Sequence, residues 1–289
     1  MLFAWIGLII CQLNYMSYNV ICDEFPLHRI ELNTRAKGLM FESTTNHVTA
    51  ESNHPEDLYD HVILATDLSG VKHILEDTLS ATPTDTPQFN IIKSLLHNSI
   101  SKLSMAPPYK LLWVWFDKQL NSPDAPVMLQ TPEFPPITCI GQVHLLQDQF
   151  IQWGNETGGS VLQFDLYAWN SGHIDDDKLW DFISPVVADI YPEIIDREFK
   201  VLDFHVHTGS NHPAFLRGME KFRPNVTLPS ELGIPNLSFA GDWLHTDYPS
   251  AFMERAVSTG REAANHVMLS DHVRQVSMTT TNPRGPGYF

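Results

Sequence analysis

A single carboxylate, placed directly after a short apolar strand, could do chemistry in this sequence. Leu237–Ala240 is apolar apart from one serine, and Gly241 and Asp242 follow it. A glycine at this point ends the strand and lets another group approach the backbone closely. Ligands in open α/β sheets usually bind just past such strand ends. We therefore expect Asp242 to accept hydrogen bonds from the hydroxyl groups of a ligand.

A helix is predicted shortly behind this carboxylate, with its first turn near Ala251, Phe252 and Met253. Helix N-termini present unpaired N–H groups and a partial positive charge, which can hold an anion or the electron-rich edge of a ring. Residues at helical spacing give it one small or apolar face: Met253, Ala256, Val257, Gly260, Ala263, Ala264, Val267 and Met268. The pattern favours a cradle for a polar cofactor. A structural role, in which Asp242 caps a turn and the helix packs on a sheet, explains it equally well.

The preceding elements indicate a sheet protein with helices. His61–Ala65 reads as a strand, and Thr66-Asp67 can cap the helix that follows. Aromatic and β-branched residues over 109–117, 137–146 and 160–169, and alternation over 199–208, predict further strands. Long strands in succession suggest an antiparallel or mixed sheet.

The stretches "NLSFAGDW" and "YPSAFMERAVSTGREAA" resemble the C-terminal flavin-binding signature of the FAD-dependent amine oxidase and phytoene (carotenoid) desaturase superfamily. The matching residues include Ala240-Gly241-Asp242 and Met253-Glu254-Arg255-Ala256. Arg255 departs from the usual glycine, and we place it on the outer face of the helix, where it should be tolerated. "DHVILATDLSGVKHIL" and "HPAFLRGMEKFRPN" are similar to further family segments, so the resemblance covers most of residues 28–270.

The resemblance implies the roles of the site residues. Asp242 would bind the ribityl or pyrophosphate part of FAD, and the N–H groups of Ala251, Phe252 and Met253 would face the pyrimidine edge of the flavin. Ala65 and Thr66 would line the adenosine side, and Gly241 and Trp243 complete the predicted cofactor-binding set. Hydride would pass from a C–H bond of a small apolar, polyene-like or amine substrate to the flavin. No catalytic acid or base is assigned.

The same resemblance implies an α/β fold. A partial FAD/NAD(P)-binding, Rossmann-like domain is expected over 26–75 and 226–275, with a mixed or antiparallel-sheet α+β substrate domain over 76–225. Residues 1–25 are an apolar segment, which a cleaved signal, a short anchor, a buried element or an artefact of the chain start would each explain. Residues 276–289 are expected to be a flexible tail.

The G-x-G-x-x-G turn that usually holds the FAD pyrophosphate has no counterpart here, since Gly7 and Gly38 stand alone before residue 60. We therefore expect the chain to correspond to the C-terminal portion of such an oxidoreductase and to bind FAD weakly or not at all. A cofactor-free remnant that serves as a binding or regulatory module is the alternative. An uncovered sheet edge would also favour association with another chain.

Composition excludes several partners. The formal net charge of −16 argues against nucleic acid and against a polybasic membrane-surface mode. The compartment stays open, and outside the N-terminal apolar run the sequence indicates a soluble or peripheral protein.

No metal site is predicted. The three cysteines, Cys11, Cys22 and Cys139, are too scattered for a zinc site or a disulfide framework. His205 and His207 share a strand face near His212, but no further ligand has convincing spacing.

Trp113–Phe116 is predicted to lie in the core. The alternative is an apolar wall for a lipid-like, membrane-associated substrate.

Overall fold

The chain folds into two compact units, which we call unit 1 (Met1–Met105 with Asn211–Phe289) and unit 2 (Ala106–Ser210). Their boundaries differ from the predicted 76 and 225, because the helix that begins at Leu68 continues to Ala81 and packs in the core of unit 1. The computed structural model describes residues 7–11, 35–41, 48–50, 59–120, 126–170, 172, 174–196, 199–247 and 251–278.

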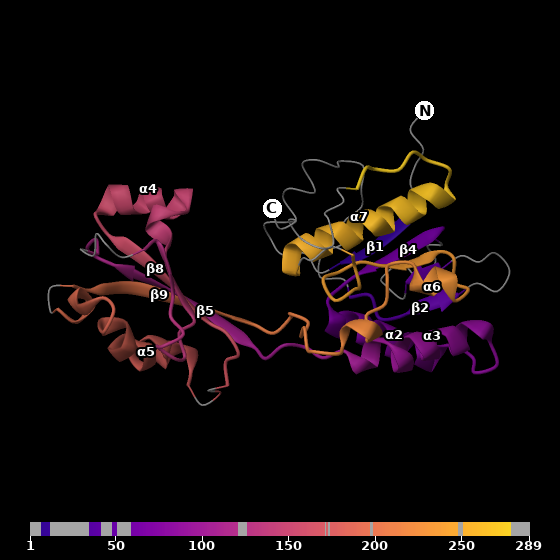
Figure 1. Cartoon of the computed structure of the whole chain (residues 1–289), viewed down its shortest axis with the longest axis horizontal. Coiled ribbons are helices and arrows are strands. Elements are labelled where there is room, and N and C mark those ends of the chain that lie inside the picture. Colours follow the sequence, from indigo (N-terminus) through magenta and orange to yellow (C-terminus); the bar gives the residue numbers. More distant parts are fainter. Residues whose placement is uncertain are drawn as a thin grey trace, which may run out of the picture. The chain divides into compact units, whose positions relative to one another are not determined.

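Unit 1 contains a parallel sheet in the order β1 (Gly7–Cys11), β4 (His61–Ala65), β10 (Leu237–Phe239). Helix α7 (Phe252–Ser270) lies on one side of it, and α2 (Leu68–Ala81) and α3 (Pro87–Asn98) lie on the other (Figure 1). The parallel strands confirm the predicted α/β class. Part of the apolar N-terminal segment thus forms a sheet strand.

The predicted cap of α2 is present in unit 1, and a second side-chain cap occurs at α3. Asp67 accepts a hydrogen bond from Gly70 N at 2.6 Å, and Thr86 caps α3 in the same way. The smaller elements are β2 (Leu39–Phe41), which pairs antiparallel with β3 (Val48–Ala50), the 3-10 helices η1 (Ile100–Lys102) and η5 (Glu220–Phe222), and α6 (Leu228–Glu231).

Unit 2 is built on a five-stranded antiparallel sheet in the order β6-β7-β8-β5-β9. Its strands are β5 (Tyr109–Phe116), β6 (Met128–Gln130), β7 (Cys139–Gln142), β8 (Ser160–Leu166) and β9 (Val201–Gly209). Its helices are α4 (Asp148–Thr157), α5 (Leu179–Ala188) and the 3-10 helices η2 (Val143–Leu145), η3 (Asp176–Lys178) and η4 (Pro192–Ile195). The prediction of an antiparallel or mixed sheet here is confirmed.

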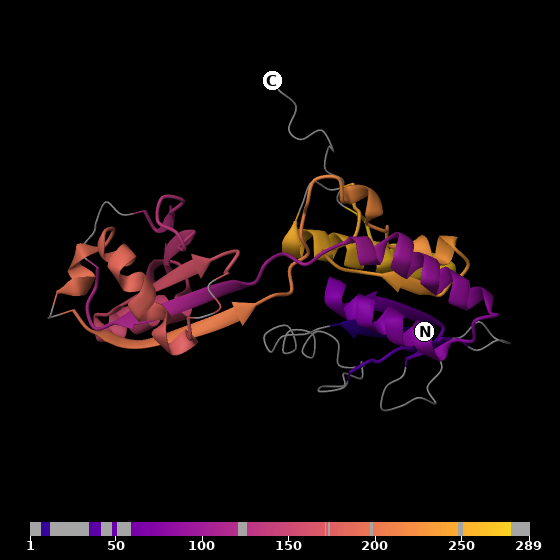
Figure 2. The same ribbon diagram turned by 90° about the horizontal axis from the view of Figure 1, so that it is seen from below.

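Alternate side chains of β5 point to opposite faces of this sheet. Leu112, Val114 and Phe116 are fully buried in a core shared with α5. Trp113 and Trp115 point to the other face and remain half-buried, where Trp115 contacts Phe150 of α4. The predicted core role therefore holds for Leu112, Val114 and Phe116, whereas a substrate wall formed by Trp113 and Trp115 stays a prediction. Figures 1 and 2 show the sheet with α5 and α4.

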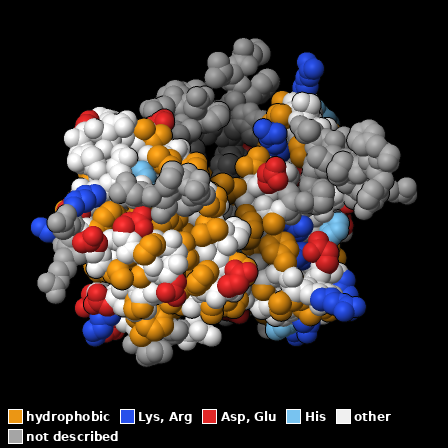
Figure 3. All heavy atoms as spheres, turned by 60° about the vertical axis from the view of Figure 1, so that its left-hand side comes forward, with side chains coloured by type: hydrophobic (Ala, Val, Ile, Leu, Met, Phe, Trp, Pro, Cys, Tyr) orange, Lys and Arg blue, Asp and Glu red, His pale blue; other side chains and the backbone are white. Residues whose placement is uncertain are grey.

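Apolar side chains also reach solvent, as the face drawn in Figure 3 shows. Among the described residues, no helix combines the length and hydropathy that crossing a bilayer requires. Cys139 is a buried free thiol. Most of the predicted flexible tail, residues 279–289, lies outside the described residues, whereas Val276 N donates to Asn265 Oδ1 on α7 at 2.8 Å.

Candidate functional site

The loop after β10 has a backbone conformation that calls for glycine. Gly241 has a φ of +146°, and a Cβ placed there would lie 2.7 Å from Trp243 Nε1 and 3.1 Å from the Thr66 carbonyl. Trp243 Nε1 donates to that same carbonyl at 3.0 Å. Because β4 and β10 are parallel neighbours, this bond ties together the segments that follow their carboxyl ends.

Thr259 of α7 holds the glycine from the other side. Its hydroxyl accepts a hydrogen bond from Gly241 N at 3.0 Å and lies 3.0 Å from Gly241 O. The buried residues of α7 are Arg255, Thr259, Ala263 and Val267.

This face differs from the predicted one. Met253 and Val257 are 83% and 56% exposed, whereas Arg255 is only 7% exposed. The expectation that Arg255 lies on the outer face is therefore wrong. Its guanidinium is buried because Nη1 donates to the Leu244 carbonyl at 2.8 Å.

Asp242 is half-buried between charged groups from several segments. Burial raises the pKa of Asp242, and the positive charges of His212 and Arg223 act in the opposite direction. Asp67, the cap of α2, adds a smaller effect in the same direction as burial. The carboxyl group thus combines limited solvation with nearby cations, a setting suited to binding polar hydroxyls.

The N-terminus of α7 lies beside the same group of residues. Ala251 is its N-cap, and its side chain makes no capping hydrogen bond. The first N–H groups of an α-helix have no acceptor within the helix itself. Phe252 is 53% exposed, and its ring centroid is 5.2 Å from that of His212. His212 therefore connects this helix end with Asp242.

The remaining predicted residues support the loop. Trp243 is fully buried against Phe239, so its side chain has a structural role, and its contact with a cofactor stays a prediction. Ala65 ends β4, and Thr66 offers its carbonyl to Trp243. The structure thus brings Gly241, Trp243 and Thr66 into direct contact.

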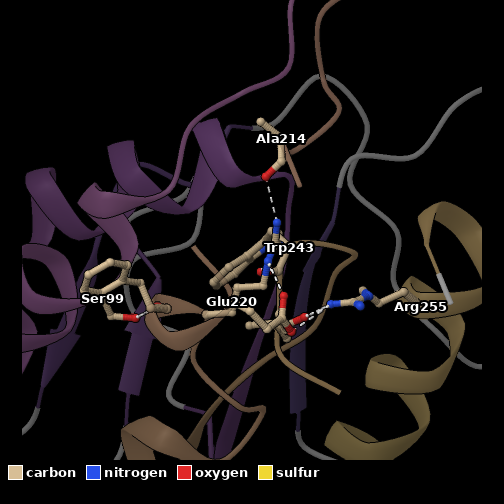
Figure 4. A network of polar contacts seen from close by, with 8 residues as sticks. Ser99, Ala214, Glu220, Trp243 and Arg255 are labelled. Atoms are coloured by element: carbon tan, nitrogen blue, oxygen red, sulfur yellow. Dashed lines mark hydrogen bonds and ion pairs between the residues drawn. The ribbon is translucent and has the colours of Figure 1, made fainter. Parts of the chain in front are cut away.

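A polar network that the sequence did not predict underlies this loop (Figure 4). Arg223, 6% exposed, donates from Nη1 to the Trp243 carbonyl at 2.7 Å and from Nη2 to the Ala214 carbonyl at 2.8 Å. Glu220 is the counter-ion, with Oε2 at 3.1 Å from Arg223 Nε and Oε1 at 3.6 Å from Arg255 Nη1. Ala214 and Trp243 lie 9 and 20 residues from Arg223, so no local pattern reveals these two contacts, whereas Glu220 stands only three residues before Arg223.

The histidines considered in the sequence analysis lie in different parts of the chain. His205 and His207 lie on β9 in unit 2, whereas His212 belongs to unit 1. His245 is exposed, and its charge acts on Glu262, whose pKa burial raises. In the described part of the chain, no three histidine, cysteine, aspartate or glutamate side chains come together as a metal site.

Comparison with known proteins identifies the family. The model of the flavin-containing amine oxidoreductases matches residues 17–268. The chain belongs to this family. Membership confirms the predicted resemblance, the oxidoreductase class and FAD as the cofactor of the family.

Two relatives of this chain are carotenoid phi-ring synthases. The Streptomyces griseus protein is 26% identical over 267 residues, which cover 90% of this chain and 47% of the relative. The Chlorobaculum tepidum protein is 25% identical over 252 residues, covering 86% and 36%. The chain thus spans less than half the length of these relatives.

A solved structure of reduced UDP-galactopyranose mutase shares the fold. It matches with a TM-score of 0.60 at 12% identity over 88% of this chain and 51% of that one.

The residues of the loop fit part of a flavin cofactor. A half-buried carboxylate such as Asp242 is a group of the kind that binds ribityl-type hydroxyls, and a helix N-terminus such as that of α7 is of the kind that binds a ring edge. Both flank His212.

Proposed function

We propose that this chain binds FAD at the Gly241–Asp242 loop and acts in an oxidoreductase on an apolar, polyene-like substrate. One observation carries the proposal: a half-buried carboxylate follows the carboxyl end of a parallel strand, beside a helix N-terminus without a side-chain cap. Ligands of α/β folds bind in such places.

In this proposal Asp242 binds the hydroxyl groups of the cofactor and the N-terminus of α7 binds its ring edge. Gly241 keeps the backbone close to the ligand, and Trp243 fills the space below the loop so that water is excluded there. Bound FAD would supply the acceptor for a hydride, two electrons and a proton, from a substrate C–H bond. Since the sequence carries no G-x-G-x-x-G turn, we expect FAD to bind this chain weakly.

We assign the substrate to the face of the unit 2 sheet that α5 does not cover. Cross-strand pairing brings His205, Trp113 and Gln163 into one row and His207, Leu111 and Asp165 into the next. Rings also meet along this face, with Trp113 and His205 at 6.0 Å and Tyr109 and Tyr167 at 6.0 Å between centroids.

A polyene suits this face better than an amine does. Burial raises the pKa of Asp165, the carboxyl group of this face, because it is poorly solvated there. Aromatic side chains provide the flat apolar area that a conjugated chain covers. The names of the two phi-ring synthases point to the same substrate class.

Flavin binding tests the first part of the proposal. The purified chain is incubated with excess FAD, and bound flavin is measured by visible absorption after gel filtration and by fluorescence titration. Asp242→Ala should weaken binding about tenfold or more, because hydrogen bonds to charged groups contribute roughly 1.5–3 kcal/mol. Asp247→Ala, an exposed carboxylate of the same loop, should bind like the parent. Absence of flavin binding by the parent chain would refute the proposal.

Polyene binding tests the second part. Trp113→Ala should weaken the binding of a solubilised carotenoid hydrocarbon about tenfold, since burying a large apolar side chain contributes roughly 1.5–3 kcal/mol. Trp180→Phe alters a tryptophan that packs on the opposite side against Phe116, and it should leave binding unchanged. Equal losses in both variants, or tighter binding of a hydrophobic amine than of the polyene, would exclude this substrate surface.

A further inference from the structure

Arg223 is a buried cation that joins three separate parts of unit 1. It reaches the Ala214 carbonyl on the segment that returns from unit 2, Glu220 on η5, and the Trp243 carbonyl directly after Asp242. Burying a guanidinium is costly unless hydrogen bonds and counter-ions compensate it. These contacts supply that compensation and at the same time fix the loop that carries Asp242.

Arg255 adds a second cation at the next carbonyl. Arg223 and Arg255 therefore hold the consecutive carbonyls of Trp243 and Leu244. Both guanidinium groups also contact the ring of Phe215, with their Cζ atoms 4.2 Å and 5.0 Å from its centroid. Figure 4 shows the ion pair between Glu220 and Arg255 as a dashed line.

Both arginines interact with the carboxylate of Glu220, whose side chain is 51% exposed and so partly screened by water. Asp242 is the further anion that interacts with Arg223, and each of the two groups favours the charged form of the other. The other charged groups that act on Asp242 are His212, from the segment before Pro213, and Asp67, from the turn before α2.

We propose that Arg223 is a positioning residue for Asp242, which it serves by holding the Trp243 carbonyl and by supplying a positive charge beside the half-buried carboxylate. The effect of Arg223 on FAD binding rests on the proposed function, whereas its effect on the protonation of Asp242 does not. An ionised Asp242 accepts hydrogen bonds from hydroxyl groups with all its oxygen lone pairs, and a protonated one does so less well.

Titration of Asp242 in the cofactor-free chain tests this directly. Carboxyl 13C NMR, with the Asp242 signal assigned by its loss in Asp242→Asn, follows protonation against pH. Arg223→Gln should increase the proton affinity of Asp242 roughly tenfold, since a nearby opposite charge commonly has an effect of this size. Arg223→Lys keeps the charge and should restore most of the parent titration. Arg217→Gln removes an exposed arginine of the same segment and serves as the control.

Flavin affinity against pH provides the second readout. In the parent chain, affinity should fall on the acid side as Asp242 takes up a proton, and in Arg223→Gln this fall should begin at higher pH. If the parent binds no FAD, the proposed function fails while the NMR titration still decides the role of Arg223. An unchanged Asp242 titration in Arg223→Gln, or an equal change in Arg217→Gln, would overturn the inference.

Should Arg223→Gln not fold, as judged by circular dichroism, Glu220→Gln addresses the same point. It leaves both arginines in place without their shared carboxylate, so the proton affinity of Asp242 should decrease. An Asp242 titration identical to that of the parent would contradict the proposal.

Discussion

Gly241 is the residue whose replacement has the most clearly defined consequence. With φ at +146° and Trp243 Nε1 at 2.7 Å from an added Cβ, Gly241→Ala is strained in both backbone and packing. We expect it to lower the free energy of unfolding by about 2 kcal/mol or more, the range known for strained backbone positions. Urea denaturation measures this.

Gly260→Ala is the matched control for that substitution. Gly260 lies within α7, and an added Cβ there has no atom within 4 Å. Alanine is the better helix former by about 1 kcal/mol, so this variant should be as stable as the parent or more so. Equal destabilisation by the two substitutions would show that the Gly241 conformation is not the cause.

His144 makes the stability of the protein depend on pH. It is 7% exposed, and Nδ1 donates to the Val161 carbonyl at 2.9 Å. Burial lowers the pKa of His144 below the ordinary value of 6.5, so the unfolded chain binds the proton first as the pH falls. The contribution of His144 to the free energy of unfolding is therefore fully present above pH 6.5. It is lost as the pH falls below that value, by at most about 1.4 kcal/mol per pH unit.

Unfolding curves at pH 7.5 and 5.5 check this expectation. His144→Gln should lose less stability between the two values than the parent does, and His97→Gln, an exposed histidine of α3, should lose as much as the parent. A His144→Gln variant with the same pH dependence as the parent would contradict the prediction.

Among the elements, α2 depends on its N-cap. Asp67→Ala removes the acceptor of the 2.6 Å hydrogen bond from Gly70 N. Loss of such a cap costs about 1 kcal/mol, which should appear as a lower urea midpoint. Asp85→Ala, at an exposed site before α3, should leave the midpoint unchanged, and a result in which both variants behave alike would argue against the capping role.

The elements that the sequence predicted well are those with local signals. The strand 61–65 and the cap at Asp67 follow from neighbouring residues and match the structure. The strand expected over 137–146 is shorter, since after Gln142 the chain turns into η2. Local pattern alone does not set that end.

The buried face of α7 was predicted less well for a physical reason. Ala263 and Val267 of the predicted face are buried, but in the first half of the helix Arg255 and Thr259 are buried where apolar spacing favoured Met253 and Val257. The hydrogen-bond partners of Arg255 and Thr259, namely Leu244 and Gly241, lie 11 and 18 residues earlier in the chain. A polar side chain can be buried only where hydrogen-bond partners are available to it. Those partners come from distant parts of the chain, so the local sequence does not reveal them.

At the scale of the whole molecule, each unit has a core of its own. The buried cluster of unit 1 and that of unit 2 share no residue. We therefore expect residues 106–210, expressed alone, to fold and to unfold cooperatively in urea, as followed by circular dichroism. Leu112→Ala, in the centre of that core, should destabilise the fragment by roughly 2–5 kcal/mol. A fragment without cooperative unfolding would show that its core needs unit 1.

The chain leaves and re-enters unit 1 at neighbouring points. Met105 forms a β-bridge with Pro213, and Ala214 N donates to the Ser104 carbonyl at 2.8 Å. In evolutionary terms, one continuous stretch of coding sequence between these points can be exchanged while the Gly241–Asp242 loop and its supports stay intact. New substrate surfaces can thus arise by recombination at a single insertion site, without any change to the residues that surround Asp242.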